Sequence, residues 1–414
     1  MDRRRWLAAA ATWLPAGRLC AARAASAASA AAAAVPLAAP APLAQLHVDR
    51  LGNLLAVTRA GELLQAGASA WQPRGAGLDP AVPVASGHGR VVGRSAAGGL
   101  WVLEAGRVQA VDRPLLAPHA GLLVLTFGVI AITPGSDGVH RVVRLDPDAG
   151  TWAESARHPG AVLPDARPLQ FDPSSASPGP HADDNGHVLV FGAPSDSRYR
   201  HGVLGDALEP TALLLLERHA LTPMARIDLP PPHVFEDIAP RPIAWRGARA
   251  LLTVRSGPLG AQLCVVAAAS AAGQFELAAL GDPVGAPNRW LSPSTDGQRL
   301  LAVVTPHIGG VLHRHAAQAG RLPGQVIARG VSNHAIGQRE LDVSAWLGSR
   351  WVVPAQDRRQ LLVIDVDALP PGRAPEAIAL AAPVLGLKAW QRGSQAGVVA
   401  LLQDGSAWWV PIRV

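Results

Sequence analysis

One pattern recurs along most of the chain and constrains the fold more than any other feature. A short apolar run of strand-forming residues is followed by a Gly or Asp turn, a second run and a polar break, after which the pattern restarts. Eight such units are present, with apolar runs at 53–57, 99–103, 122–125, 188–191, 250–254, 300–304, 361–364 and 398–402. Apolar runs this continuous are typical of strands that are buried on both faces.

The repeated units predict an all-β fold, a single β-propeller of seven or eight four-stranded blades. Two polar restarts, Asn288–Trp290 and Asn333–Ala335, lie 45 residues apart, as four-stranded blades require. Each blade would bury its faces against its neighbours. A stacked pair of β-sandwiches is the alternative, but no linker divides the units. We expect residues 408–414 to close the ring against an N-terminal strand, with 47–57 as the candidate.

The first 24 residues have the layout of a signal peptide of the twin-arginine type. Arg3–Arg5 precede Trp6 and a weakly apolar, alanine-rich stretch, and small-x-small cleavage sites follow. A disordered alanine-rich leader and general secretory export are the alternatives. The expected location is therefore periplasmic or secreted.

The rest of the chain divides into an Ala/Pro-rich linker over 25–44 and the propeller domain over 45–414. The longest apolar run in the propeller domain, Ala120–Thr133, is too short to cross a bilayer, so no transmembrane segment is predicted in the mature chain. Cys264 lies in an apolar run and is expected to be a core residue.

Charge argues against a nucleic-acid partner. The formal net charge is +6, but arginines of the first 24 residues supply most of it, and no basic cluster follows. Lys388 is the only lysine of the chain. The predicted partner is an unknown protein or a small polar ligand.

Several polar motifs in the second half of the chain resemble those of one family. They lie at 199–206, 233–238, 288–293, 305–310 and 332–337. With these motifs, His181–Val366 resembles bacterial FG-GAP/VCBS-repeat proteins, which have an integrin-like propeller. The resemblance implies that fold.

The calcium loops of that family, of the form D-x-D-G-D-G, bind the cation through clustered carboxylates. The equivalent places here, 244–249 and 294–299, contain arginines and few carboxylates. The resemblance therefore implies degenerate calcium loops and no metal, with Asp296-Gly297 as a hairpin turn. The acidic loop His181–Gly186 is left as either a calcium site or an Asx turn.

Seven polar residues stand just before the first strands of their units and would meet at one mouth of the propeller channel. They are His201, Glu236, Asp237, Arg289, Trp290, Asn333 and His334. Their mixture of charges, amides and an aromatic ring would orient a polar ligand. The alternative, which the residue types favour, is that they cross-link neighbouring blades, with Arg289 paired to Glu236 or Asp237.

No arrangement of residues predicts catalysis. The chain has no Gly-x-Ser-x-Gly elbow, glycine-rich phosphate loop or His-Glu-x-x-His motif, so we predict no catalytic residue, metal or cofactor. The sequence favours a non-enzymatic exported scaffold that binds at the channel mouth. A propeller enzyme, such as a quinoprotein-like oxidoreductase or a lyase, is one alternative. A carbohydrate-binding module is another, and it would need exposed tryptophans on one rim.

Overall fold

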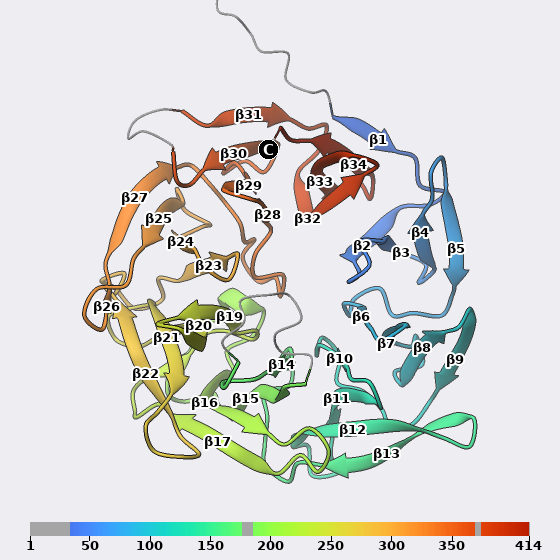
Figure 1. Cartoon of the computed structure of the whole chain (residues 1–414), viewed down its shortest axis with the longest axis horizontal. Coiled ribbons are helices and arrows are strands. Elements are labelled where there is room, and N and C mark those ends of the chain that lie inside the picture. Colours follow the sequence, from blue (N-terminus) through green and yellow to red (C-terminus); the bar gives the residue numbers. More distant parts are fainter. Residues whose placement is uncertain (1–33, 176–184, 369–373, 414) are drawn as a thin grey trace, which may run out of the picture. The chain divides into compact units, whose positions relative to one another are not determined.

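The apolar runs of the sequence form inner and middle strands of eight antiparallel sheets in the computed structural model (Figure 1). The structure describes residues 34–175, 185–368 and 374–413. Middle strands are buried throughout, as in β3 and β16, because sheets cover both of their faces. Outermost strands such as β9 and β27 are largely exposed.

The sheets are the blades of a β-propeller, and blades 1 to 8 are numbered here in chain order. From the innermost strand outward, blade 1 is β2 (Leu43–Val48), β3 (Leu54–Thr58), β4 (Leu63–Ala66) and β5 (Trp71–Gly75). Blade 2 is β6 (Ala85–Gly87), β7 (Arg90–Arg94), β8 (Leu100–Glu104) and β9 (Arg107–Val111). Blade 3 is β10 (Leu123–Val124), β11 (Val129–Pro134), β12 (His140–Asp148) and β13 (Thr151–Arg157). Blade 4 is β14 (Leu169–Phe171), β15 (His187–Ser195), β16 (Glu209–Leu216) and β17 (Pro223–Asp228).

The second half of the chain continues the series. Blade 5 is β18 (Val234–Phe235) and β19 (Arg241–Trp245), then β20 (Ala248–Ser256), β21 (Gln262–Ala268) and β22 (Phe275–Gly281). Blade 6 is β23 (Leu291–Thr295), β24 (Leu300–Val304), β25 (Val311–His315) and β27 (Gly324–Arg329). Blade 7 is β28 (Ala345–Leu347), β29 (Arg350–Pro354), β30 (Gln360–Asp365) and β31 (Glu376–Ala379). Blade 8 is β32 (Val384–Arg392), β33 (Gln395–Leu402), β34 (Ala407–Pro411) and β1 (Val35–Leu37).

Each of the eight repeated units of the sequence falls in its own blade, so the propeller prediction is confirmed and the blade number is eight. Blade 5 departs from the common plan. Residues 236–240 split its innermost strand into β18 and β19, which both pair with β20. A short strand from the blade 6 region, β26 (Arg321–Leu322), adds to β22 in parallel.

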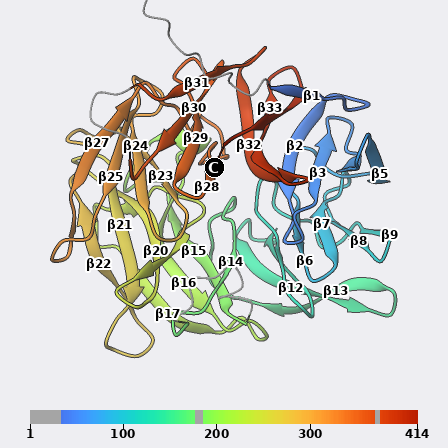
Figure 2. The same ribbon diagram turned by 45° about the horizontal axis from the view of Figure 1, so that its top comes forward.

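The ring closes through β1, which pairs with β34 in the register Val35↔Trp409 and Leu37↔Ala407 (Figure 1). Figure 2 shows β1 beside β33 of the same blade. Closure by the C-terminal strand is thus confirmed, but 47–57 is not its partner, because those residues belong to β2 and β3 of blade 1. Residues 35–37, assigned to the linker from their composition, are an edge strand, a position that tolerates Pro36. Residues 1–33, with the expected signal peptide and cleavage sites, lie outside the described residues.

The core consists of apolar clusters between neighbouring blades. One cluster joins Leu43 and Leu54 of blade 1 to Val399 and Trp409 of blade 8, across the closing seam. Others join blades 1 and 2, 2 and 3, 6 and 7, and 7 and 8, and the largest extends from blade 3 to blade 6. Cys264 is fully buried in this largest cluster, as expected. Among the described residues, no helix has the length and apolar character needed to cross a membrane.

Candidate functional site

His201 and Glu236 lie in contact between blades 4 and 5. The Nδ1 atom of His201 is 2.5 Å from Oε1 of Glu236, and the Ser256 hydroxyl donates to Oε2 of the same carboxylate. Glu236 is completely buried at the break between β18 and β19. Burial raises the pKa of Glu236, although His201 and Ser256 both favour the ionised carboxylate.

Trp290 links this pair to two histidines of blades 6 and 7. Its Nε1 donates to the backbone oxygen of Glu236 at 3.0 Å, and its ring packs against His334 with centroids 4.7 Å apart. Nδ1 of His334 is 2.7 Å from Nε2 of His307, and its Nε2 is 2.7 Å from the oxygen of Gln338. One proton on each ring satisfies both bonds. Burial lowers the pKa of His307 to about 4 and that of His334 to about 3, so both rings are neutral at pH 7.

Asp237 and Asn333 are also buried and bonded within the protein. Oδ2 of Asp237 accepts from Arg241 at 2.9 Å and from the Thr253 hydroxyl at 2.8 Å. Nδ2 of Asn333 donates to Asp342 at 2.9 Å. The two residues thereby fix the break in blade 5 and the approach to blade 7.

Arg289 is the one candidate that stays apart from this network. It is exposed, and among the described residues its side chain donates to the neighbouring Asn288 oxygen alone, at 3.4 Å. The expected pairing of Arg289 with Glu236 or Asp237 is therefore wrong, because His201 and Arg241 occupy those carboxylates. The other six candidates link blades 4 to 7, which agrees with the cross-linking alternative.

The loops at 244–249 and 294–299, which the sequence analysis matched to calcium loops, are tight hairpins between first and second strands. In the turn between β23 and β24, Gly297 has a φ of +92° and Oδ1 of Asp296 accepts from the backbone of Gln298 and Arg299. The Arg299 guanidinium lies 2.6 Å from Oδ2 of Asp296. The Arg299 side chain therefore neutralises the Asp296 carboxylate in this turn. In the described residues no three His, Cys, Asp or Glu side chains gather as a metal site would need. Most of the His181–Gly186 loop lies outside those residues.

A long loop between blades 7 and 6 reaches across the centre of the ring, and we call residues 330–344 the crossing loop (Figure 1). Arg339 in this loop binds Asp165 at 2.7 Å and Asp206 at 2.9 Å, both on the blade 4 side. The backbone of Gly337 donates to the Val203 oxygen at 2.9 Å. These contacts hold the crossing loop to blade 4, on the far side of the centre from its own blade.

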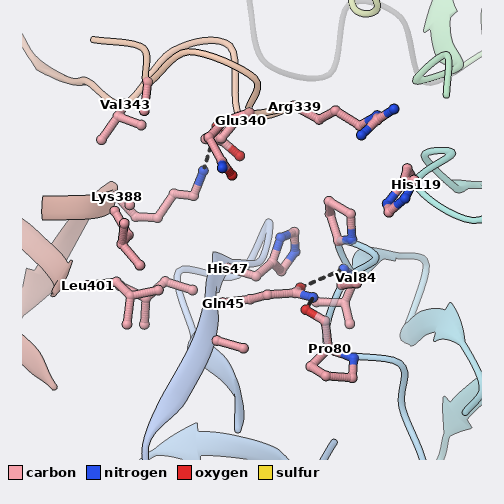
Figure 3. Close-up of a pocket in the computed structure, with 18 of the residues that line it drawn as sticks. Gln45, His47, Pro80, Val84, His119, Arg339, Glu340, Val343, Lys388 and Leu401 are labelled. Atoms are coloured by element: carbon pink, nitrogen blue, oxygen red, sulfur yellow. Dashed lines mark hydrogen bonds and ion pairs between the residues drawn. The ribbon is translucent and has the colours of Figure 1, made fainter. Parts of the chain in front are cut away.

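A cavity of about 580 Å³ lies beside the crossing loop, and we call it the central cavity (Figure 3). Its wall combines the innermost strands β2 and β32, the loops that lead into blades 2, 3 and 4, and the crossing loop. It is therefore on the inter-blade face, where the chain passes from each blade to the next. A second cavity of about 710 Å³ shares Arg167 and Glu340 with it and extends towards Arg241 and Trp346.

One side of the central cavity is held rigidly by hydrogen bonds between blades 1 and 2. The Gln45 amide donates to the oxygens of Pro80 and Val82 at 2.6 and 2.8 Å (Figure 3). His47 lies 2.7 Å from the Ser86 hydroxyl, and burial lowers its pKa to about 4. These two polar side chains therefore serve the frame of the cavity.

The opposite side carries charge. Glu340 points towards Lys388, with 3.8 Å between Oε1 and Nζ (Figure 3). Its Oε2 is 3.8 Å from Nη1 of Arg167. Burial alone would raise the pKa of Glu340, but the positive charges of Lys388 and Arg167 outweigh it and lower the pKa. The carboxylate is therefore ionised at neutral pH.

Sequence reasoning places a mouth where the inter-blade loops converge, and the central cavity is there, but none of the seven candidates lines it. The sequence analysis did not identify the cavity residues Arg167, Arg358 and Glu340, because they come from different loops of the ring and lie in no motif. Lys388 carries a signal, since it is the only lysine of the chain. Composition alone does not say that β32 is an innermost strand.

Comparisons with solved structures agree with the fold. The chain is similar to BamB from Moraxella catarrhalis, with a TM-score of 0.52, 14% identity, and coverage of 92% of this chain and 96% of that one. Sqt1 from Saccharomyces cerevisiae matches with a TM-score of 0.54 and 8% identity, and the computationally designed Ika8 protein with 0.55 and 9%. Each of these covers 92% of this chain and 100% of the other. At such identities the likeness concerns the fold alone. No protein-family model matches the chain, and no curated protein matches it in sequence.

Proposed function

We propose that this propeller is a non-enzymatic binding protein that takes a small polar ligand, or a short segment of a partner protein, in the central cavity. The observation that carries the proposal is a cavity of about 580 Å³, a volume typical of ligand sites, at the centre of the inter-blade face. Its frame is preformed, since Gln45, His47 and Arg339 are already fixed by hydrogen bonds or ion pairs. A preformed site spends little free energy on ordering when it binds.

The location of the protein is part of the same proposal. The twin-arginine layout of residues 1–24 supports export of the folded chain, and a periplasmic or secreted binding protein fits that route. The resemblance to FG-GAP/VCBS repeats supports a common origin with proteins of that family, with arginine in place of the calcium ligands.

The carbohydrate alternative is less well supported. Sugar platforms need exposed aromatic faces, whereas no tryptophan within the described residues is exposed. Trp101, Trp290 and Trp351 are fully buried between blades. The enzyme alternative has no specific observation in its favour.

The experiment is a screen of mixed metabolites (acids, amines, sugars and short peptides) by ligand-detected NMR with the full chain. Leu385 lines the central cavity and is 44% exposed, so Leu385→Trp should fill the cavity without disturbing the core. We expect compounds that bind the wild type and are lost with Leu385→Trp. Finding no compound of any class with this behaviour would overturn the proposed function.

A further inference from the structure

The wall of the central cavity has more positive charge than its carboxylate can balance. Four basic side chains line it, Arg167, Arg339, Arg358 and Lys388, against the single carboxylate of Glu340. Arg339 is neutralised by Asp165 and Asp206 outside the cavity. Three cations therefore remain for one acid.

Glu340 holds its two nearest cations loosely. Both Lys388 and Arg167 lie 3.8 Å from its oxygens, whereas charge-assisted hydrogen bonds are about 2.7–2.9 Å long. Each cation thus keeps donors for another acceptor. Lys388 reaches this place from the innermost strand β32.

Arg358 is the least satisfied of the three cations. Its Nε donates to the Val384 oxygen at 2.8 Å, but no carboxylate of the described residues lies within ion-pair distance. Its Nη1 is buried and has no hydrogen-bond partner within the described part of the chain, and the same is true of Nε of Arg167. Burial lowers the pKa of Arg358 to about 10, which leaves the guanidinium charged at neutral pH. Both atoms lie beneath the cavity surface, so what they add to the wall is positive charge that no acceptor of the described residues balances at these atoms.

The remaining wall is apolar. Pro80, Pro83 and Val84 line the cavity from the loop before blade 2, and Leu385 and Leu401 line it from blade 8. A ligand that fills this space would therefore combine an acidic group with an apolar body.

We propose that the central cavity binds a small organic anion, a carboxylate or a phosphate monoester with an apolar body, through Lys388, Arg358 and Arg167. The inference rests on the proposed function and names the ligand class for the same site. Guanidinium groups match the paired oxygens of both acids, and the lysine adds a point charge. Glu340 opposes the anion and limits its affinity.

The test uses three fluorinated probes with the full chain at low ionic strength, followed by ¹⁹F NMR titration. The probes are 4-fluorobenzoate, 4-fluorophenyl phosphate and the neutral 4-fluorobenzamide. We expect one or both anions to bind at least about tenfold more tightly than the amide, a difference of about 1.4 kcal/mol. The better anion identifies the acid that the site prefers. Equal binding of the amide, or no anion binding at about 10 mM, would overturn the inference.

Three variants should change the affinity for the anion in three different ways. Lys388→Met should weaken anion binding several-fold, and Glu340→Gln should strengthen it several-fold because the competing charge is removed. Arg392→Met is the matched control, since Arg392 is exposed at the far end of the same strand and should leave the affinity unchanged. Equal losses in Lys388→Met and Arg392→Met would mean a general charge effect and would reject the site. Melting temperatures of all variants check that each is folded.

The same measurements separate this inference from the proposed function. If the metabolite screen finds a sugar or an amine that Leu385→Trp excludes, while the anionic probes do not bind, the cavity is a binding site for another ligand class. The anion inference then fails and the binding function stands.

Discussion

At the scale of single residues, the histidines near Trp290 show how burial changes a side chain's chemistry. His334 is completely buried against His307 and Trp290, and it donates from Nε2 to the Gln338 oxygen. Its pKa is lowered to about 3, far below the ordinary value of 6.5. The folded protein therefore resists protonation that the unfolded chain accepts. Stability from this group is present above pH 6.5 and is lost as the pH falls towards 3.

This difference predicts a pH dependence. As the pH is lowered from 6 to 4, the free energy of unfolding should fall by about 1.4 kcal/mol for each pH unit on account of His334 alone. Denaturant titrations of the wild type and His334→Gln at several pH values would measure it. The variant cannot titrate at this position, so its curve should be shallower. Parallel curves would contradict the assignment of a buried, neutral His334.

At the scale of elements, the two ends of the crossing loop are anchored in the apolar core by Val331, Leu341 and Val343, whereas its middle is held to blade 4 by charge. Arg339 joins it to Asp165, whose side chain is only 6% exposed, and to the more exposed Asp206. Removing one partner of a buried pair leaves an unbalanced charge, which costs more than the pair contributes. The position of the loop, and with it the cavity wall, therefore depends on Arg339.

We expect Arg339→Met to lower the free energy of unfolding by about 2–4 kcal/mol, measured in urea. The matched control is Arg321→Met, which breaks the exposed pair between Arg321 and Asp282. Exposed pairs contribute about 0–1 kcal/mol, so the control should change little. If both variants lower the free energy of unfolding by the same small amount, Arg339 contributes no more to stability than an exposed ion pair does.

At the scale of the whole molecule, stability depends on closing the ring. Every cluster of the core lies between blades, so an open ring would expose apolar surface on two blades at once. The closing blade combines both ends of the described chain, because β1 adds to β34. Cooperative unfolding should therefore require the C-terminal strand.

Deletion of residues 407–414 should abolish the cooperative transition in differential scanning calorimetry. A truncated chain that melts normally would refute this. Loss of β1 alone should be milder, since it removes three edge residues. A chain that starts at Ala38 should melt a few degrees below one that starts at Ala34. Both chains lack residues 1–33, so the difference between their melting temperatures reports the loss of β1.

The sequence by itself determined the fold class and the eight repeated units. These follow from local patterns, because a strand buried on both faces must be apolar over its whole length. It also indicated that six polar residues, among them Glu236 and His334, cross-link blades. It could not find β1, since Val35–Leu37 lies in an Ala/Pro-rich stretch that reads as a linker and forms a strand because β34 offers an edge.

Only the tertiary structure decided which side chains share the centre of the ring. Lys388, Arg167, Arg358 and Glu340 are far apart in sequence and belong to no motif, and they meet because separate blades converge there and the crossing loop reaches blade 4. It also decided that His201 and Arg241, and not Arg289, bind the two buried acids. Local patterns record burial and turns, whereas partners of charged groups are set by distances that exist only after the ring has closed.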